Sequence, residues 1–248
     1  MRVNKMSLIK STIKTSELNK APFNWPIVGF LLVMTGIPGV PAIFLLTLVI
    51  LGPSADGTIS SLINALYFET PAAILVHGSS GVLFFLTMPF QFSPALRNKN
   101  ANWHKIGGRI VLLSGYVMAV SGIWMHHVLS PDSFGIRYVS LVIMSIAMCA
   151  AFSLALWHII KRNAQMHRKW MIRAVAVTLA AVTPLFVEAI LHLLFGQLES
   201  ILAILSQFQH DYGRLVGIGI NLAVVEFIFV KEKFTRQTHQ KLTTLTES

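Results

Sequence analysis

Six long apolar stretches, separated by short polar segments, make up most of the chain. Each is close to the ~20 residues that an α-helix needs to cross a hydrocarbon core ~30 Å thick. The stretches cover residues 25–51, 71–92, 106–129, 138–160, 170–195 and 213–230. This pattern predicts an all-α protein, an integral membrane bundle of six transmembrane helices.

The basic residues are placed so that they orient this bundle. Of the 20 Lys and Arg residues, all except Arg137 and Arg214 lie in the N-terminal arm, in the tail, or beside the loops that follow the second and fourth spans. Cytoplasmic segments of membrane proteins carry an excess of Lys and Arg, so both termini are expected in the cytoplasm. The sequence therefore predicts a multi-pass protein of the cell membrane, expected in a bacterial inner membrane, whose first partner is the lipid bilayer.

Few residues lie outside the six predicted spans, so the chain is expected to form one compact domain. Residues 1–24 are expected to form a basic cytoplasmic arm, residues 25–230 the transmembrane domain, and residues 231–248 a solvated cytoplasmic tail. The formal net charge of +10 does not indicate nucleic-acid binding, because the charges flank helix ends, where they set orientation and meet anionic headgroups. Cys149 is the only cysteine, which excludes an internal disulfide.

Two prolines interrupt the first apolar stretch, where residues 37–41 read Ile-Pro-Gly-Val-Pro. Proline removes a backbone hydrogen bond, so a kink or break is expected near mid-membrane. One interpretation is a discontinuous helix that lines a substrate site, as in transporters. The interpretation that we favour is a kinked peripheral helix packed on its neighbours.

Histidine is the main candidate for chemistry, because most of the nine histidines lie within or at the ends of the predicted helices. One expected layer, at the outer side, contains His77, His126, His127, His192 and His210. A second layer, at the inner side, contains His104, His158 and His167. Two layers of imidazoles on opposite faces of a helical bundle suit a membrane cytochrome, in which two haem b groups carry an electron across the bilayer.

The depths of these residues suggest which imidazoles share an iron. The expected ligands are His77 with His127 or His192 at the outer haem, and His104 with His158 or His167 at the inner haem. Gly81 and Gly108 each follow a histidine by four residues, and so face the same way and leave room for a flat porphyrin. For His126, His127 and His210, a simple position at the headgroup level is the favoured interpretation.

Glu188 and His192 offer a different chemistry, because they share one face of the fifth span. With His77 and either His126 or His127, they could complete a mixed nitrogen and oxygen site for zinc, copper or iron, as in a metal-dependent membrane enzyme. The simpler interpretation is that Glu188 holds the tautomer of His192. The histidine-rich boxes of membrane di-iron enzymes are absent from the sequence.

The most distinctive string is residues 167–173, HRKWMIR, a basic loop that passes into a helix. Together with residues 77–81 (HGSSG), 89–92 (PFQF), Arg97 and 104–109 (HKIGGR), it resembles an uncharacterised bacterial membrane family, domain of unknown function 2306. The likeness covers about residues 73–183 and implies no activity. The positions that it singles out are His77, Gln91, Arg97, His104, Arg109, His167, Trp170 and Arg173.

Four arginines are expected to surround His104 and His167 at the inner surface. They are Arg97, Arg109, Arg168 and Arg173. Guanidinium groups in such a cluster suit haem propionates, the head of a quinone or an anionic substrate.

The six spans also resemble, more loosely, the cytochrome b561 type of two-haem protein, which has one histidine on each of four consecutive helices. The corresponding residues here would be His77, His104, His158 and His192. That family pairs alternate helices, whereas the depths above pair others, so the likeness is architectural. The leading expectation is a haem b electron-transfer protein with a quinone or another redox protein as partner. The alternatives are a cofactor-free transporter or scaffold, or the metal-dependent enzyme.

Overall fold

The computed structural model describes residues 23–52 and 64–246, so most of the predicted arm, residues 1–24, lies outside the described residues. The described ranges contain helices and turns and no strand. The helices are α2 (Trp25–Leu51), α4 (Leu66–Glu69), α5 (Pro71–Thr87), the short 3-10 helix η1 (Pro89–Phe92), α6 (Pro94–Lys99), α7 (Ala101–Leu129), α8 (Ile136–Ile160), α9 (Ala164–Leu179), α10 (Thr183–Phe195) and α11 (Glu199–Thr246). The all-α prediction is confirmed.

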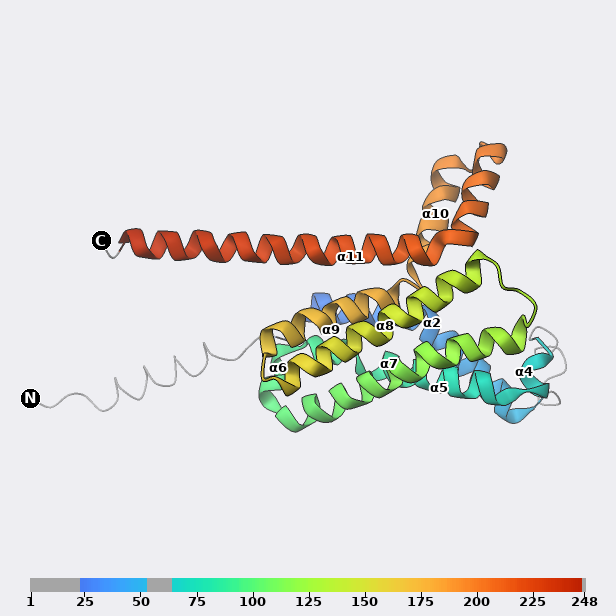
Figure 1. The fold of residues 1–248 in the computed structure, drawn as a ribbon, viewed down its shortest axis with the longest axis horizontal. Helices are drawn as coiled ribbons and strands as arrows, with labels where there is room; N and C mark the ends of the chain where they lie inside the picture. The colour runs from blue at the N-terminus through green and yellow to red at the C-terminus, as the bar shows by residue number, and fades with distance from the viewer. Residues whose placement is uncertain (1–22, 53–63, 247–248) are drawn as a thin grey trace, which may run out of the picture.

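The long helices lie side by side along one axis (Figure 1). Contacts run in order from α2 to α5, α7, α8 and α9, and α11 covers α8 and α9. We call the end that holds α6 and the α8–α9 turn the basic end, and the opposite end, which holds α4 and the α7–α8 loop, the far end. Near the far end, α10 and the first turns of α11 rise away from the bundle as a helical hairpin (Figure 1).

The spans agree with the hydropathy pattern, with one difference. Five helices are long and apolar enough to cross a membrane. The predicted fifth span, residues 170–195, is instead the pair α9 and α10, bent by 53° at a short break, which brings the number to six if the pair counts as one span. The side on which the termini lie stays a prediction.

The first span is one continuous helix through Pro38 and Pro41, so the break considered there does not occur. It packs on α5 through glycines, as the favoured interpretation of a packed helix requires. A Cβ at Gly39 would lie 2.7 Å from the Phe85 ring, and one at Gly78 would lie 3.0 Å from Leu46. At the other end of the chain, α11 continues as helix to Thr246, through most of the segment predicted as a cytoplasmic tail, residues 231–248.

Small residues let α7 approach its neighbours. Its buried positions include Gly107, Val111, Gly115, Ala119 and Gly122, which follow one another every three or four residues along one face. The ring of Phe152 on α8, which is fully buried, lies against Gly115. Close approach through small residues is the usual basis of helix packing in membranes.

We expect Gly115→Ala to lower the stability of the bundle by about 1–3 kcal/mol, the usual effect of overpacking a core. The added Cβ would lie 2.5 Å from Phe152, whose ring has no free space to move into. The matched control is Gly29→Ala on α2, where a Cβ meets nothing within 4 Å. The measurement is the melting temperature of each protein in detergent, and equal melting temperatures for the two variants would contradict the expectation.

Candidate functional site

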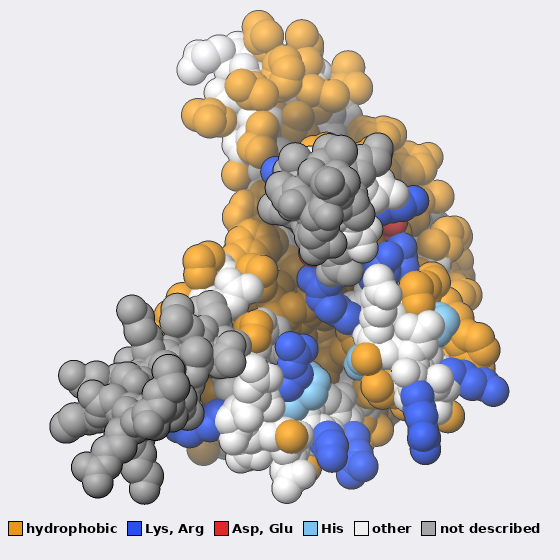
Figure 2. Space-filling view, turned by 90° about the vertical axis from the view of Figure 1, so that its left-hand side faces the viewer, with side chains coloured by type: hydrophobic (Ala, Val, Ile, Leu, Met, Phe, Trp, Pro, Cys, Tyr) orange, Lys and Arg blue, Asp and Glu red, His pale blue; other side chains and the backbone are white. Residues whose placement is uncertain are grey.

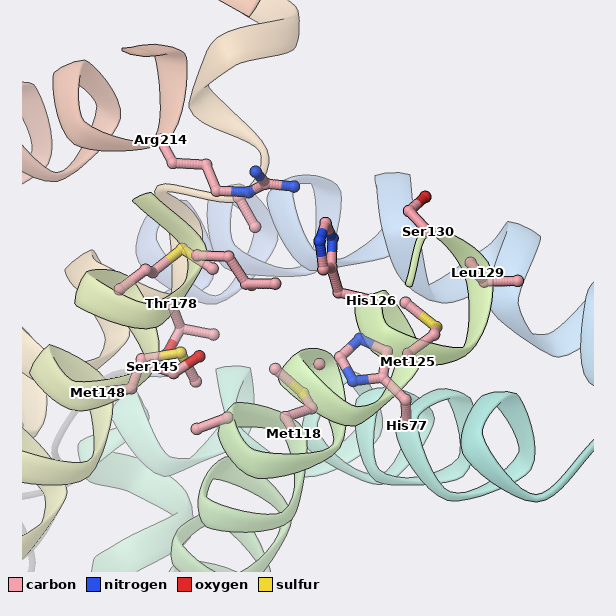
Figure 3. A pocket seen from close by; sticks show the side chains of 15 residues that line it. His77, Met118, Met125, His126, Leu129, Ser130, Ser145, Met148, Thr178 and Arg214 are labelled. Carbon is pink, nitrogen blue, oxygen red and sulfur yellow. The ribbon is translucent and has the colours of Figure 1, made fainter. Parts of the chain in front are cut away.

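A cavity of about 280 Å³ lies toward the far end, between α5, α7, α8 and the end of α9 (Figure 3). Two histidines line it, His77 from α5 and His126 from the last turn of α7. Most of its walls are apolar. The sequence placed both histidines in one outer layer, and the structure brings these two to one cavity.

The His77 imidazole is held in one tautomer. The Ser121 hydroxyl donates to the Val117 carbonyl, and therefore accepts at its oxygen from Nδ1–H of His77, 3.1 Å away. With the proton on Nδ1, Nε2 carries the lone pair of the neutral ring. Figure 3 shows the His77 ring turned toward the void that His126 and Arg214 also face.

Glycine and methionine shape the space around His77. A Cβ at Gly122 would lie 3.4 Å from Cε1 of His77, so this glycine lets the ring lie against α7. Gly81, expected to leave room for a porphyrin, faces the sulfur of Met118, 3.9 Å from the position of a Cβ. Four of the ten methionines line this one cavity: Met118, Met125, Met144 and Met148. Their thioethers are soft ligands in an otherwise apolar wall.

A second cavity, of about 550 Å³, adjoins the first and shares Ala181 and Arg214 with it. It lies beside α10 and the first turns of α11. Arg214 is partly buried and donates from Nη1 to the carbonyl of Arg137, 3.2 Å away. Sequence reasoning did not select Arg214, although an arginine inside an apolar stretch is itself a signal of function.

The break in the fifth span borders both cavities, and α11 holds it in place. The Asn221 amide donates to the Ala176 carbonyl and to the Thr183 hydroxyl, at 2.9 Å each, and so joins the two sides of the break. A Cβ at Gly217 would lie 2.9 Å from the carbonyl oxygen of Ala180. The sequence signal for this contact is the spacing of four residues between Gly213, Gly217 and Asn221, which puts them on one face of α11.

The basic end brings His104 and His167 together, as predicted. The charges that act on His104 include those of Arg97 and His167. Nδ1–H of His167 donates to the Ala155 carbonyl, 2.8 Å away, which leaves its Nε2 free. Figure 2 shows Lys, Arg and His side chains around a hollow at this end.

The helix starts that carry these two histidines are fixed by caps. The Asn100 side chain accepts from the backbone of Trp103 at the start of α7, and the Asn163 side chain accepts from that of Met166 at the start of α9. Such caps satisfy backbone donors that a helix leaves free in its first turn.

Two of the four arginines expected around these histidines bind carboxylates of α11 instead. Arg173 donates to both oxygens of Glu226, at 2.6 and 3.0 Å, and its guanidinium lies over the Trp170 ring, 4.7 Å from the centroid. Arg168 makes the same bidentate contact with Glu232. These pairs fasten α9 to α11. Arg97 and Arg109 are exposed and stay candidates for an anionic ligand.

The other predicted ligands lie apart from the cavity of His77. His127 is exposed and bonds the Tyr138 hydroxyl, 3.1 Å away. His158 packs edge-on against Trp157 at the other end of the bundle. Neither His127 nor His192, the expected partners of His77, lines its cavity, and His126 does.

The proposed mixed metal site is not assembled. His192 lies 3.4 Å from Glu188 on the hairpin, as the simpler interpretation expects, and Ser206 donates to the same carboxylate. His77 lines the other cavity. Across residues 23–52 and 64–246, no three His, Cys, Asp or Glu side chains are grouped to hold a metal ion.

Comparison with known proteins supports the membrane assignment. Residues 74–229 match the family described as predicted membrane protein (DUF2306), a match over more than half of the chain. It includes His77, His104 and His167, and extends past the expected residues 73–183 to include Arg214 and Asn221. No curated protein and no solved structure matches the chain.

Proposed function

The chain belongs to DUF2306, a family of membrane proteins, and we propose that it is a membrane electron-transfer protein that binds haem b in the far-end cavity, with His77 as an iron ligand. The observation that carries the proposal is the free Nε2 of His77, directed into a cavity and fixed there by Ser121. Imidazoles that bind a metal commonly donate their other N–H to a neighbouring oxygen, which sets the tautomer and the ring orientation.

The cavity offers both kinds of second axial ligand that haem iron takes in electron carriers, histidine and methionine. His126 donates from Nε2 to the Ser133 carbonyl, 2.8 Å away, and so keeps its lone pair on Nδ1. Met118 and Met125 lie on the same face of α7, seven residues apart, and line the same cavity. The absorption spectrum of the bound haem is the measurement that distinguishes a nitrogen ligand from a sulfur ligand.

Size and polarity also support a large apolar group. Ligand pockets are commonly about 300–1,000 Å³, with apolar walls and a few polar groups that fix orientation. The first cavity alone, at about 280 Å³, is just below this range. The adjoining cavity of about 550 Å³ shares Arg214 with it and enlarges the space open to a ligand. When bound, haem b would supply a one-electron carrier, and the chain would hold and desolvate it.

The proposal includes a second haem at the basic end, between His104 and His167. Its support is the same tautomer argument, because His167 donates Nδ1–H to a carbonyl and keeps Nε2 free. Two groups near opposite ends of the bundle would give an electron a path along its axis. A quinone head or another redox protein, contacting Arg97 or Arg109, is the expected partner at this end.

The test is the absorption spectrum of protein purified from haem-replete cells. We expect a haem spectrum that sharpens on reduction with dithionite, and a pigment that acid acetone extracts, because a chain with one cysteine has no C-x-x-C-H attachment motif. Haem content per chain separates one site from two. A folded but colourless preparation, free of bound iron, would overturn the proposal.

A second candidate function, transport, is favoured by one observation. The break between α9 and α10 borders both cavities, with Ala181 lining each. Discontinuous helices at substrate sites are typical of transporters. The colourless outcome of the same experiment would favour this candidate over electron transfer.

A further inference from the structure

We propose that Arg214 is the centre of an oxyanion-binding site at the junction of the two far-end cavities, and that its ligand carries a carboxylate or phosphate group on an apolar body. Arg214 is the one charged residue common to both cavities among the described residues. Figure 3 shows its guanidinium directed toward the void that His77 and His126 line.

Among residues 23–52 and 64–246, no carboxylate forms an ion pair with Arg214. Arg214 lies within the candidate span Glu199–Thr235 and is partly buried. Its one hydrogen bond in the described part of the chain goes to a backbone carbonyl, so most of its five N–H donors are free. A cation inside a membrane span normally pairs with an anion or marks the path of a substrate.

The neighbouring carboxylates have partners of their own. Asp211, one turn before Arg214, accepts from Gln207 and from His210, at 2.9 and 3.1 Å. Glu188, the acidic residue that lines the second cavity, accepts from Ser206 and pairs with His192. Among the described residues no carboxylate is left for this guanidinium, and a bound anion is the partner that we propose for it.

Other groups on the second cavity suit the same ligand. Arg137 lines it and adds a second positive charge. Gln209 is buried and donates to the Pro184 carbonyl, 3.3 Å away, which holds its amide at the break. Pro184 is in the first turn of α10, where the helix dipole is positive. Guanidinium groups bind carboxylate and phosphate oxygens in bidentate fashion.

The residues that line the two cavities indicate the chemistry of the rest of the ligand. Methionine side chains line the first cavity, and Ala181, Pro184, Leu185 and Ala203 line the second. An oxyanion at Arg214 would thus place apolar parts of the same molecule against these side chains. A fatty carboxylate and the phosphate of a lipid head group share this chemistry, and so does a haem propionate.

The experiment measures melting of the full chain in neutral detergent at constant ionic strength. The probes are octanoate, inorganic phosphate and phosphatidylglycerol, with chloride as the reference salt. The protein carries His77→Ala, which is expected to remove haem from the far-end cavity, so that the result does not depend on the function proposed for that cavity. A saturating ligand should raise the melting temperature by about 5–10 °C. A shift with octanoate or phosphate indicates a soluble anion, and a shift with phosphatidylglycerol alone indicates a lipid head group.

Variants connect the shift to the site. Arg214→Gln should lose it, and Arg214→Lys should retain only part, because an ammonium cannot make the bidentate contact. The matched control is Lys105→Gln, which removes one exposed positive charge at the basic end. If Arg214→Gln fails to fold, Ala203→Phe, which fills the second cavity and leaves the charge intact, should abolish the shift. The absence of a shift in the parent protein, or an unchanged shift in both Arg214→Gln and Ala203→Phe, would overturn the inference.

Discussion

His77→Ala is expected to abolish haem binding at the far-end cavity and to leave the bundle folded. The substitution removes the only imidazole on α5, and with it the free Nε2 that faces the cavity. A porphyrin iron would then keep at most one protein ligand, from α7. The helices should stay inserted, because the ring lies against Gly122 and its loss removes no cap or ion pair.

The measurement is haem content per folded chain, with His127→Ala as control. His127 is one residue beyond His126 and is the same residue type, but it is exposed and bonds Tyr138. We expect wild-type far-end haem in this control and none in His77→Ala. Ser121→Ala should weaken haem affinity about 10–100-fold, the usual effect of removing the partner of a ligating imidazole. Full haem content in His77→Ala would exclude His77 as a ligand.

The positions of the spans could be predicted from the sequence because hydropathy is a local property. Four helices follow the apolar stretches closely, and the last one, Glu199–Thr235, includes the predicted stretch 213–230 but begins 14 residues before it. The break at residues 180–182 was not predicted, although Pro184 follows it directly and cannot donate a backbone hydrogen bond to the Ala180 carbonyl four residues earlier. Asn221 and Gly217, some 40 residues later, add a hydrogen-bond donor to the Ala176 carbonyl and the space for α11 to approach the break. The prolines of the first span suggested a break where the helix is continuous.

Depth in the membrane could also be predicted, but direction around each helix could not. His126 and His127 have almost the same depth, yet neighbouring residues of a helix point about 100° apart. One lines the cavity of His77 and the other faces Tyr138. From the sequence, His127, and not His126, was named as a ligand beside His77. Depth alone does not distinguish these two histidines. His104 and His167 were grouped from depth and loop position alone, and the structure places His167 near enough for its charge to act on His104.

Electrostatic partners from distant helices explain the remaining differences. Arg173 was expected to bind an anionic ligand, and it is bound by Glu226 from a helix 53 residues away. Conversely, Arg214 was counted only as one of two basic residues on the sparsely charged side, and it is a partly buried cation with no carboxylate partner among the described residues. A count of charges per loop orients a membrane protein, but it does not say which charges neutralise each other.

Asn221→Leu is expected to destabilise the bundle at the break between α9 and α10. The Ala180 N–H bonds to Val177, so the Ala176 carbonyl depends on the Asn221 amide. Leucine has the same branching as asparagine but no hydrogen-bond donor, and it would leave this buried carbonyl unsatisfied, at about 1–3 kcal/mol. Gly217→Ala should cost a similar amount, because its Cβ would meet the backbone oxygen of Ala180, which cannot move aside as a side chain can.

Gly219→Ala provides the matched control, two residues from Gly217 on the same helix, where a Cβ meets nothing within 4 Å. Melting temperatures in detergent should fall for Asn221→Leu and Gly217→Ala and should not fall for Gly219→Ala. Because Ala181 lines both cavities, the same two variants should also weaken any ligand bound there, whereas Gly115→Ala, at a position that lines neither cavity, should lower stability more than affinity. If Asn221→Leu melted as the wild type does, the α9–α10 break would be stable without α11, and the hydrogen bonds of Asn221 could not be its cause.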